Sequence, residues 1–273
     1  MPEGPEIRRA ADKLAQVLEG QVITTIRFGL PKLRRYAKQL RQQRVTRIET
    51  RGKALLTHFE HGYSIYSHNQ LYGVWQVADG HRLPSTNRSM RLLLQTDRHS
   101  AILYSASDIS VWPTAELLEH PFLAKIGPDI MDDNLNWRDI AARLRENRFA
   151  GKELCALYLD QAFLAGNGNY LRSEIIHDAH LNPRSRPRDL SSGELGRLAR
   201  STLAVSRRSY ETGGITLTPR LSNSLKKQGL SQGRRRFYVF EREGAPCYYC
   251  GESIHRREVG SRRLYHCPGC QGD

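Results

Sequence analysis

The first six residues, Met1-Pro2-Glu3-Gly4-Pro5-Glu6, have types and an order that could do chemistry. A small second residue favours removal of the initiator methionine, so we expect the mature chain to begin at Pro2. An α-amino group has a pKa of about 8, so part of this secondary amine is unprotonated at neutral pH. Such an amine can attack an electrophilic carbon and form an iminium, and Glu3 is a candidate proton donor or acceptor. The alternative is that the prolines only stiffen the terminus before a helix.

A second group of candidate residues lies near the other end of the chain. It consists of two C-x-x-C pairs with 16 residues between them, namely Cys247, Cys250, Cys267 and Cys270. This spacing is typical of a zinc ribbon, in which four thiolates complete a tetrahedral site and leave no open position. We therefore predict one structural Zn(II). His255 and His266 could substitute as ligands, although four cysteines suffice, and Cys155 is expected in the core.

The elements that would position these groups differ along the chain. From Glu3 to Glu19 the apolar residues have helical spacing, and Gly20 follows as a stop signal. From residue 22 to about 105, short runs rich in β-branched and aromatic residues predict the strands of a sandwich or barrel. The expected strands are Val22–Phe28, Val45–Thr50, Ala54–Glu60, Tyr63–His68, Leu71–Val77, Met90–Thr96 and Ala101–Tyr104.

Two turns of this β-rich half carry side chains that could contact a ligand. The turn Arg51-Gly52-Lys53 lies between two strands, where Lys53 could equally be an ordinary surface lysine. The segment Asn69–Gly73 has a polar, apolar and aromatic tip that ends in glycine. It could be ordinary hairpin packing, or a wedge that enters a base stack.

Helices are expected in the second half of the chain. The patterns predict helices over Trp137–Leu144, Leu154–Leu164 and Tyr170–Ala179, and a capping box from Ser191 to Glu194 opens a fourth. The turn Gly166-Asn167-Gly168-Asn169 suits either close approach of a phosphate or a tight helix connection. Residues 211–236 contain six basic residues and one acid and are expected to form a flexible, functional loop.

These patterns divide the chain into four parts. They are an N-terminal helix with a β-sandwich (1–125), a linker (126–135), a helical domain that ends in the basic loop (136–236), and a zinc-ribbon hairpin (237–273). The predicted fold class is therefore α+β and multidomain.

The net charge of the chain indicates its partner. Lys and Arg number 42 against 28 acidic residues, a formal net charge of +14 at pH 7. Such an excess favours a polyanion, and nucleic acid is favoured over a membrane because no lipidation signal or basic amphipathic anchor is present. There is no run of about 18 apolar residues and no apolar signal-peptide core. We therefore expect an intracellular protein without a membrane partner.

Taken together and in this order, these features resemble the formamidopyrimidine-DNA glycosylase/endonuclease VIII family of base-excision repair enzymes. The resemblance rests on the Pro-Glu-Gly-Pro-Glu run, the β-rich first half, the Arg51-Gly52-Lys53 turn, the helix–GNGN–helix segment and the four-cysteine hairpin, and it covers essentially the whole chain. Ser67–Gly73 and Tyr104–Asp108 are similar to the bacterial endonuclease VIII branch.

The resemblance implies a fold, an activity and partners. The fold would be an N-terminal helix and β-sandwich, a helix–two-turn–helix domain and a zinc β-hairpin. The activity would be that of a bifunctional DNA glycosylase and abasic-site lyase that removes oxidised bases, with pyrimidines favoured. The enzyme would act as a monomer on damaged double-stranded DNA in the bacterial cytoplasm, associated with the nucleoid through DNA, with no organic cofactor.

The resemblance also implies the roles of single residues in the reaction. Pro2 would attack C1′ of the damaged nucleoside, and Glu3 would handle the proton as the sugar ring opens. Lys53 matches the family's second catalytic lysine, which transfers a proton in β-elimination. Arg262 matches the hairpin arginine that holds phosphate and assists δ-elimination, and the spacing to the third cysteine favours it over Arg263.

Five further residues match positions that contact DNA in the family. Gln70, Leu71 and Tyr72 would fill the gap left when the nucleotide flips out, at a cost of roughly a few kcal/mol for unstacking. Asn169 matches an asparagine that grips phosphate. Lys125 occupies a position where arginine is the familiar residue, so the charge is kept and the bidentate geometry is lost.

Two alternative functions remain at this stage. The first is a member of the same family that prefers oxidised purines such as 8-oxoguanine, which the cluster Gln70-Leu71-Tyr72 disfavours. The second is a zinc-ribbon protein that only binds DNA. It explains the charge and the cysteines, but it leaves Pro2 and Glu3 without a role.

Overall fold

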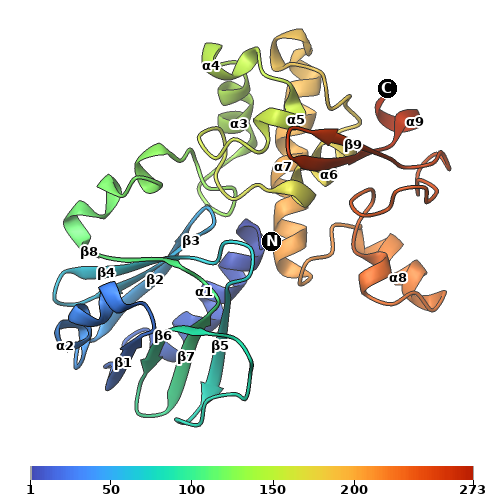
Figure 1. Cartoon of the computed structure of the whole chain (residues 1–273). Coiled ribbons are helices and arrows are strands. Elements are labelled where there is room, and N and C mark those ends of the chain that lie inside the picture. The colour runs from blue at the N-terminus through green and yellow to red at the C-terminus, as the bar shows by residue number, and fades with distance from the viewer. Residues whose placement is uncertain (1, 273) are drawn as a thin grey trace. The chain divides into compact units, whose positions relative to one another are not determined.

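The computed structural model describes residues 2–272, which fall into two compact units (Figure 1). The first unit contains Pro2 and Glu6–Lys125, and the second contains Glu3–Pro5 and the chain from Ile126 onward. The second unit is therefore discontinuous in sequence, since three residues near the N-terminus belong to it. The expected removal of Met1 concerns a residue outside the described range.

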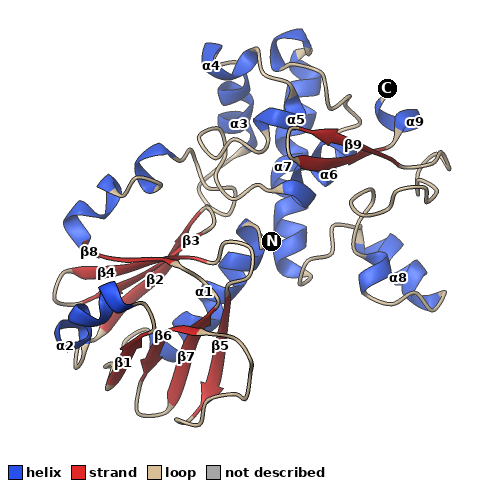
Figure 2. Cartoon of the chain, viewed as in Figure 1, coloured by secondary structure: helices blue, strands red, loops and turns tan. Residues whose placement is uncertain are grey.

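The first unit is built from two four-stranded antiparallel sheets, drawn as arrows in Figure 2. One sheet has the order β2 (Val45–Arg51), β3 (Ala54–Phe59), β4 (Tyr63–His68) and β8 (Asp108–Pro113). The other has the order β1 (Thr25–Phe28), β6 (Met90–Gln95), β7 (His99–Tyr104) and β5 (Val74–Asp79). The predicted β-sandwich is confirmed.

A single core joins the two sheets to the N-terminal helix α1 (Gly4–Leu18). Ile7, Leu14 and Leu18 recur at helical spacing on the buried face of α1 and pack with apolar residues of both sheets. The short helices of this unit are η1 (Pro31–Tyr36), α2 (Ala37–Leu40), η2 (Thr114–Glu119) and η3 (Leu123–Lys125).

The second unit is mainly helical. Its helices are α3 (Trp137–Leu144), α4 (Asn147–Ala150), α5 (Leu154–Leu157), α6 (Asn169–Asp178), η4 (Pro187–Asp189), α7 (Ser192–Glu211), α8 (Pro219–Lys227), η5 (Gly233–Arg235) and α9 (Pro268–Gln271). Its strands are β9 (His255–Val259) and β10 (Arg262–His266), which form an antiparallel hairpin. The capping box predicted at Ser191 and Glu194 is present and begins α7.

Three elements differ from the expectation. The helix expected over Leu154–Leu164 ends at Leu157, because the carboxylate of Asp160 accepts the backbone N–H of Ala162 and so favours a turn. Strand β8 was not predicted. The loop 211–236 contains helix α8, which Thr218 caps through its side chain and Pro219 begins. Among the described residues, no helix combines the length and apolar character needed to cross a membrane.

Candidate active site

The carboxylate of Glu3 is held at the N-terminus of α6. It is 3% exposed and accepts hydrogen bonds from the backbone N–H groups of Tyr170 (2.9 Å) and Leu171 (3.2 Å). These N–H groups have no partner within the helix, and the helix dipole favours a negative charge at this end. The two backbone N–H groups therefore hold the carboxylate of Glu3 in place.

The turn 166–169 makes room for Glu3 and Gly4 near the N-terminus. The N–H of Gly4 donates to the carbonyl of Gly166 (2.8 Å), and Gly166 has a φ of 100°, which L side chains rarely adopt. A Cβ atom on Gly168 would lie 2.3 Å from Cδ of Glu3. The glycines of this turn thus allow close approach of the segment Glu3–Gly4.

A buried arginine joins the turn to the hairpin. Arg172 is 0% exposed and donates to Oδ1 of Asn169 (2.6 Å) and to the carbonyls of Cys155 (3.1 Å) and Arg263 (3.0 Å). Nδ2 of Asn169 donates to the same carbonyl of Arg263 (2.9 Å). Burial lowers the pKa of Arg172 to about 10, so it stays charged at pH 7. Arg172 therefore fixes the side chain of Asn169 and the start of β10.

Arg172 thus contacts Asn169 and the backbone of β10, although the sequence did not single it out. Besides burial and Cys155, the charge of Glu3 raises the pKa of Arg172 and that of Arg262 lowers it. Arg262 is exposed at the first position of β10, directly after the turn Gly260–Ser261. The position of Arg172 three residues after Asn169 could have indicated their contact in the sequence, because residues at i and i+3 share one face of a helix.

The predicted residues of the first unit lie near the ends of β2, β3 and β4. Lys53 is in the turn between β2 and β3, and its neighbour Ala54 pairs with His68 at the end of β4. The segment Asn69–Gly73 follows and connects β4 to β5, with Leu71 50% and Tyr72 71% exposed.

Two predicted residues show few distinguishing contacts. Pro2 is partly exposed and lies two residues before the first residue of α1. Lys125 is exposed at the end of η3, where its N–H donates to the carbonyl of Phe122 (3.1 Å).

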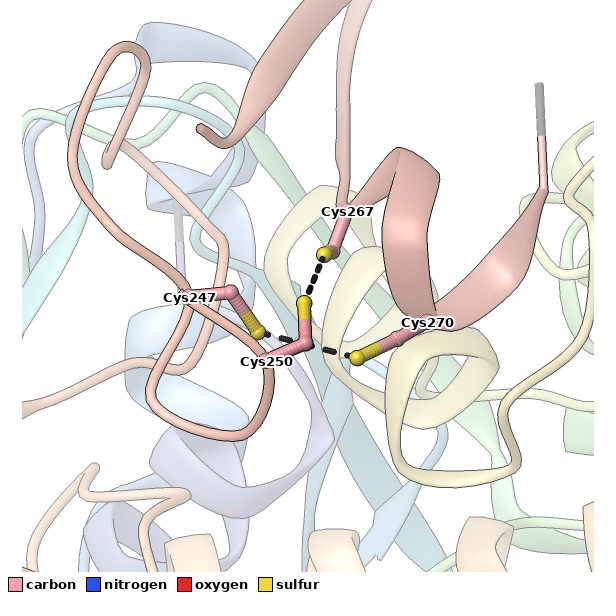
Figure 3. A group of neighbouring side chains, drawn as sticks. All are labelled: Cys247, Cys250, Cys267 and Cys270. Carbon is pink, nitrogen blue, oxygen red and sulfur yellow. Dashed lines mark hydrogen bonds between the residues drawn. The ribbon is translucent and has the colours of Figure 1, made fainter. Parts of the chain in front are cut away.

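The four cysteines converge as a metal site would require (Figure 3). Their Sγ atoms all lie within 4.8 Å of one another, with 3.8 Å from Cys247 to Cys270 and 3.4 Å from Cys250 to Cys267. A tetrahedral Zn(II) with Zn–S bonds of about 2.3 Å would place its sulfurs about 3.8 Å apart. The donor set fits one structural Zn(II).

The histidines considered as alternative zinc ligands are placed elsewhere. His255 and His266 pair across the hairpin β9–β10, with ring centroids 5.9 Å apart, and the metal-binding group of the described residues consists of the cysteines alone. Cys155 is buried in the core, as predicted.

The chain is similar to known proteins in both sequence and fold. Residues 1–107 match the family model described as the formamidopyrimidine-DNA glycosylase N-terminal domain. The chain is 46% identical over 271 residues to the proteins named Endonuclease 8 of Escherichia coli (strain K12 / DH10B) and of Klebsiella pneumoniae (strain 342), which covers 99% of this chain and 100% of each relative.

Solved structures with the same fold include two complexes of Lactococcus lactis formamidopyrimidine-DNA glycosylase. The complex with DNA that contains an abasic site has a TM-score of 0.80 at 21% identity, covering 99% of this chain and 100% of that one. The complex with DNA that contains an oxidised pyrimidine has a TM-score of 0.82 at 21% identity, covering all of both chains.

Proposed function

Because the chain belongs to the formamidopyrimidine-DNA glycosylase/endonuclease VIII family, we propose that it removes oxidised pyrimidines from DNA through the amine of Pro2. The observation that carries this proposal is the 46% identity to the Endonuclease 8 proteins over 99% of the chain. Enzymes of this family are DNA glycosylases and abasic-site lyases of base-excision repair, and this chain is one of them.

In the proposed reaction, the lone pair of the Pro2 nitrogen attacks C1′ and the bond from C1′ to the base breaks. The base leaves with the bonding electrons and takes up a proton from solvent. The Pro2 nitrogen gives its proton to the carboxylate of Glu3, which passes it to the ring oxygen as the sugar opens. The product is an iminium between Pro2 and C1′. The iminium makes the C2′ proton acidic, so its loss expels the 3′ phosphate by β-elimination, and δ-elimination then expels the 5′ phosphate.

The chain's own groups suit these steps. The N–H groups of Tyr170 and Leu171 orient the carboxylate of Glu3, and fixed orientation is what makes a proton donor efficient. We assign proton transfer in β-elimination to Lys53 and assistance to δ-elimination to Arg262. The four cysteines would hold Zn(II), whose chemistry is to fix the fold of the hairpin that carries Arg262.

DNA binding would use the basic charge of the chain and a small number of placed groups. We propose that Asn169 and Lys125 contact phosphates and that Gln70, Leu71 and Tyr72 occupy the gap left by the flipped nucleotide. Phosphate contacts release counterions, so affinity should fall steeply with salt. We further propose that the protein works as a monomer at the nucleoid, where its substrate is.

Borohydride trapping tests the proposal. The protein is incubated with oligonucleotides that contain thymine glycol, 8-oxoguanine opposite cytosine, or a plain abasic site, and the iminium is reduced to a stable adduct. We expect an adduct through Pro2, strongest with thymine glycol, and its loss in Pro2→Gly. Intact mass must first show that the tested chain begins at Pro2.

Each other outcome selects a different function. A stronger adduct with 8-oxoguanine would keep the mechanism and assign the enzyme to the oxidised-purine branch. No adduct from a chain that begins at Pro2 would leave a zinc-bearing DNA-binding protein. Glu3→Gln should lose base removal more than cleavage of a preformed abasic site, and equal loss in both assays would contradict the role assigned to Glu3.

A further inference from the structure

The segment Asn69–Gly73 is folded tightly and against backbone preference. Gln70 has a φ of 54°, in the left-handed region that non-glycine residues rarely adopt. The N–H of Gly73 donates to the carbonyl of Asn69 (2.7 Å), and a Cβ atom on Gly73 would lie 2.3 Å from that oxygen. Because such a conformation is costly, other contacts must hold it.

Three side chains outside the segment supply those contacts. Nδ1 of His68 accepts the N–H of Gln70 (3.0 Å). The N–H (3.2 Å) and the hydroxyl (2.9 Å) of Ser107 both donate to Oε1 of Gln70. Nη1 of Arg88 donates to the carbonyl of Tyr72 (2.8 Å). These groups come from three different parts of the chain, so the segment is held by tertiary contacts as well as by its own turn.

The segment carries large apolar side chains exposed to solvent. Leu71 is 50% and Tyr72 is 71% exposed, whereas Asn69 and Gly73 at its ends are buried. An apolar group that enters a base stack is most effective when it does not have to be ordered on binding. A segment that is held at both ends and exposes Leu71 and Tyr72 meets this requirement.

We propose that His68 and Ser107, assisted by Arg88, are positioning residues that hold Gln70-Leu71-Tyr72 in its DNA-inserting shape before DNA binds. This inference rests on the proposed function. It also gives the side chain of Gln70 a part in holding the segment, since its Oε1 accepts both hydrogen bonds from Ser107. The orientation of the amide is fixed by chemistry, because the backbone N–H of Ser107 can only donate.

His68 also links the segment to the turn that carries Lys53. His68 pairs with Ala54 on one side and Asp108 on the other, and Phe122 contacts its ring (5.8 Å between centroids). Burial lowers the pKa of His68, with Asp108 opposing this effect and Lys53 adding to it. The backbone N–H of Gln70 can only donate, so Nδ1 is the ring nitrogen that accepts this bond.

The test compares two substitutions of equal size. His68→Asn keeps an acceptor near the place of Nδ1, and His68→Leu removes it. Single-turnover removal of thymine glycol from duplex DNA requires insertion into the stack, whereas cleavage of an abasic site in single-stranded DNA does not. Because a hydrogen bond contributes about 1 kcal/mol net, we expect His68→Leu and Ser107→Ala to slow duplex excision about fivefold to tenfold each.

The matched readouts separate this role from a loss of folding. In His68→Leu and Ser107→Ala, single-strand cleavage and thermal melting should stay near wild type. His68→Asn should retain most of the duplex excision rate. Ser85→Ala, at an exposed serine, should change neither cleavage assay. Equal losses on both substrates, or no difference between His68→Asn and His68→Leu, would overturn the inference. Failure of the wild-type protein to remove thymine glycol from duplex DNA would instead refute the proposed function.

Discussion

Gly168→Ala should displace the carboxylate of Glu3 and slow base removal more than trapping on an abasic site. The added Cβ would lie 2.3 Å from Cδ and 2.4 Å from Oε1 of Glu3, far inside normal contact. Gly168 has a φ of −143°, which any residue adopts, so the backbone itself is not strained by alanine. The added Cβ would also lie 2.7 Å from Cγ of Glu3, so the side chain of Glu3 must move and take its carboxylate with it.

The displacement would remove the contacts that orient the carboxylate. The carboxylate would lose its hydrogen bonds from the N–H groups of Tyr170 (2.9 Å) and Leu171 (3.2 Å) and its position at the N-terminus of α6. Hydrogen bonds to a charged group contribute about 1.5–3 kcal/mol each, so about 3–6 kcal/mol of orienting interaction is at stake. A shift of about 1 Å in a reacting group can cost about 100-fold in rate. We therefore expect base removal to slow by about 100-fold or more.

Single-turnover excision of thymine glycol measures the effect, with thermal melting and trapping on an abasic site alongside. Gly193→Ala is the control, because it also lies at the start of a helix and its added Cβ meets only Oγ of Ser191 at 3.9 Å. Trapping on an abasic site should stay close to wild type in both variants, whereas melting should fall only in Gly168→Ala, because only that variant loses the two hydrogen bonds to Glu3. A Gly168→Ala protein that excises thymine glycol at the wild-type rate would refute the assignment of Glu3.

Three further changes are predicted to alter metal content or stability. Cys250→Ser should reduce bound zinc from one per chain to nearly none and lower the melting temperature, and unchanged melting would count against a structural metal. Burial alone would raise the pKa of Glu49, but His58, Arg47 and Arg51 outweigh it and lower the pKa to about 2 from an ordinary 4.5. The stabilisation is therefore full above about pH 4.5 and is lost as the pH falls toward 2; it amounts to about 1–2 kcal/mol after allowance for solvent screening. In Glu49→Gln, the free energy of unfolding should fall less steeply between about pH 4.5 and pH 2 than it does in the wild type. Equal slopes for the two proteins in this range would contradict this reasoning. Asn167 is 0% exposed, and neither polar atom of its amide has a partner among the described residues. Asn167→Leu should therefore raise stability by about 1–2 kcal/mol in denaturant unfolding, and a less stable variant would show that the amide is satisfied.

Much of the fold could be predicted because its patterns are local. The spacing of Ile7, Leu14 and Leu18 indicated α1, the pair Ser191 and Glu194 indicated the start of α7, and the cysteine spacing indicated the metal group. Helix α8 was missed although Thr218 and Pro219 are ordinary start signals, because the basic residues around them suggested a flexible loop.

The contacts that position the candidate residues could not be predicted in the same way. The bond from Tyr170 to Glu3 joins residues 167 positions apart, and the one from Ser107 to Gln70 joins residues 37 apart. No local pattern encodes such pairs. Arg172 also looks like a surface residue in sequence, and only the folded unit shows that its guanidinium is buried against three carbonyl oxygens of other residues.

The discontinuity of the second unit also sets an order for biosynthesis. Every strand of the two sheets lies between Thr25 and Pro113, so the sandwich can form while later residues are still being added. Glu3 leaves the ribosome early, but the N–H groups that seat it follow 167 residues later. At about 5–20 residues per second, this delay is roughly 10–30 s. The carboxylate of Glu3 therefore cannot be oriented in a nascent chain until Tyr170 and Leu171 have been added.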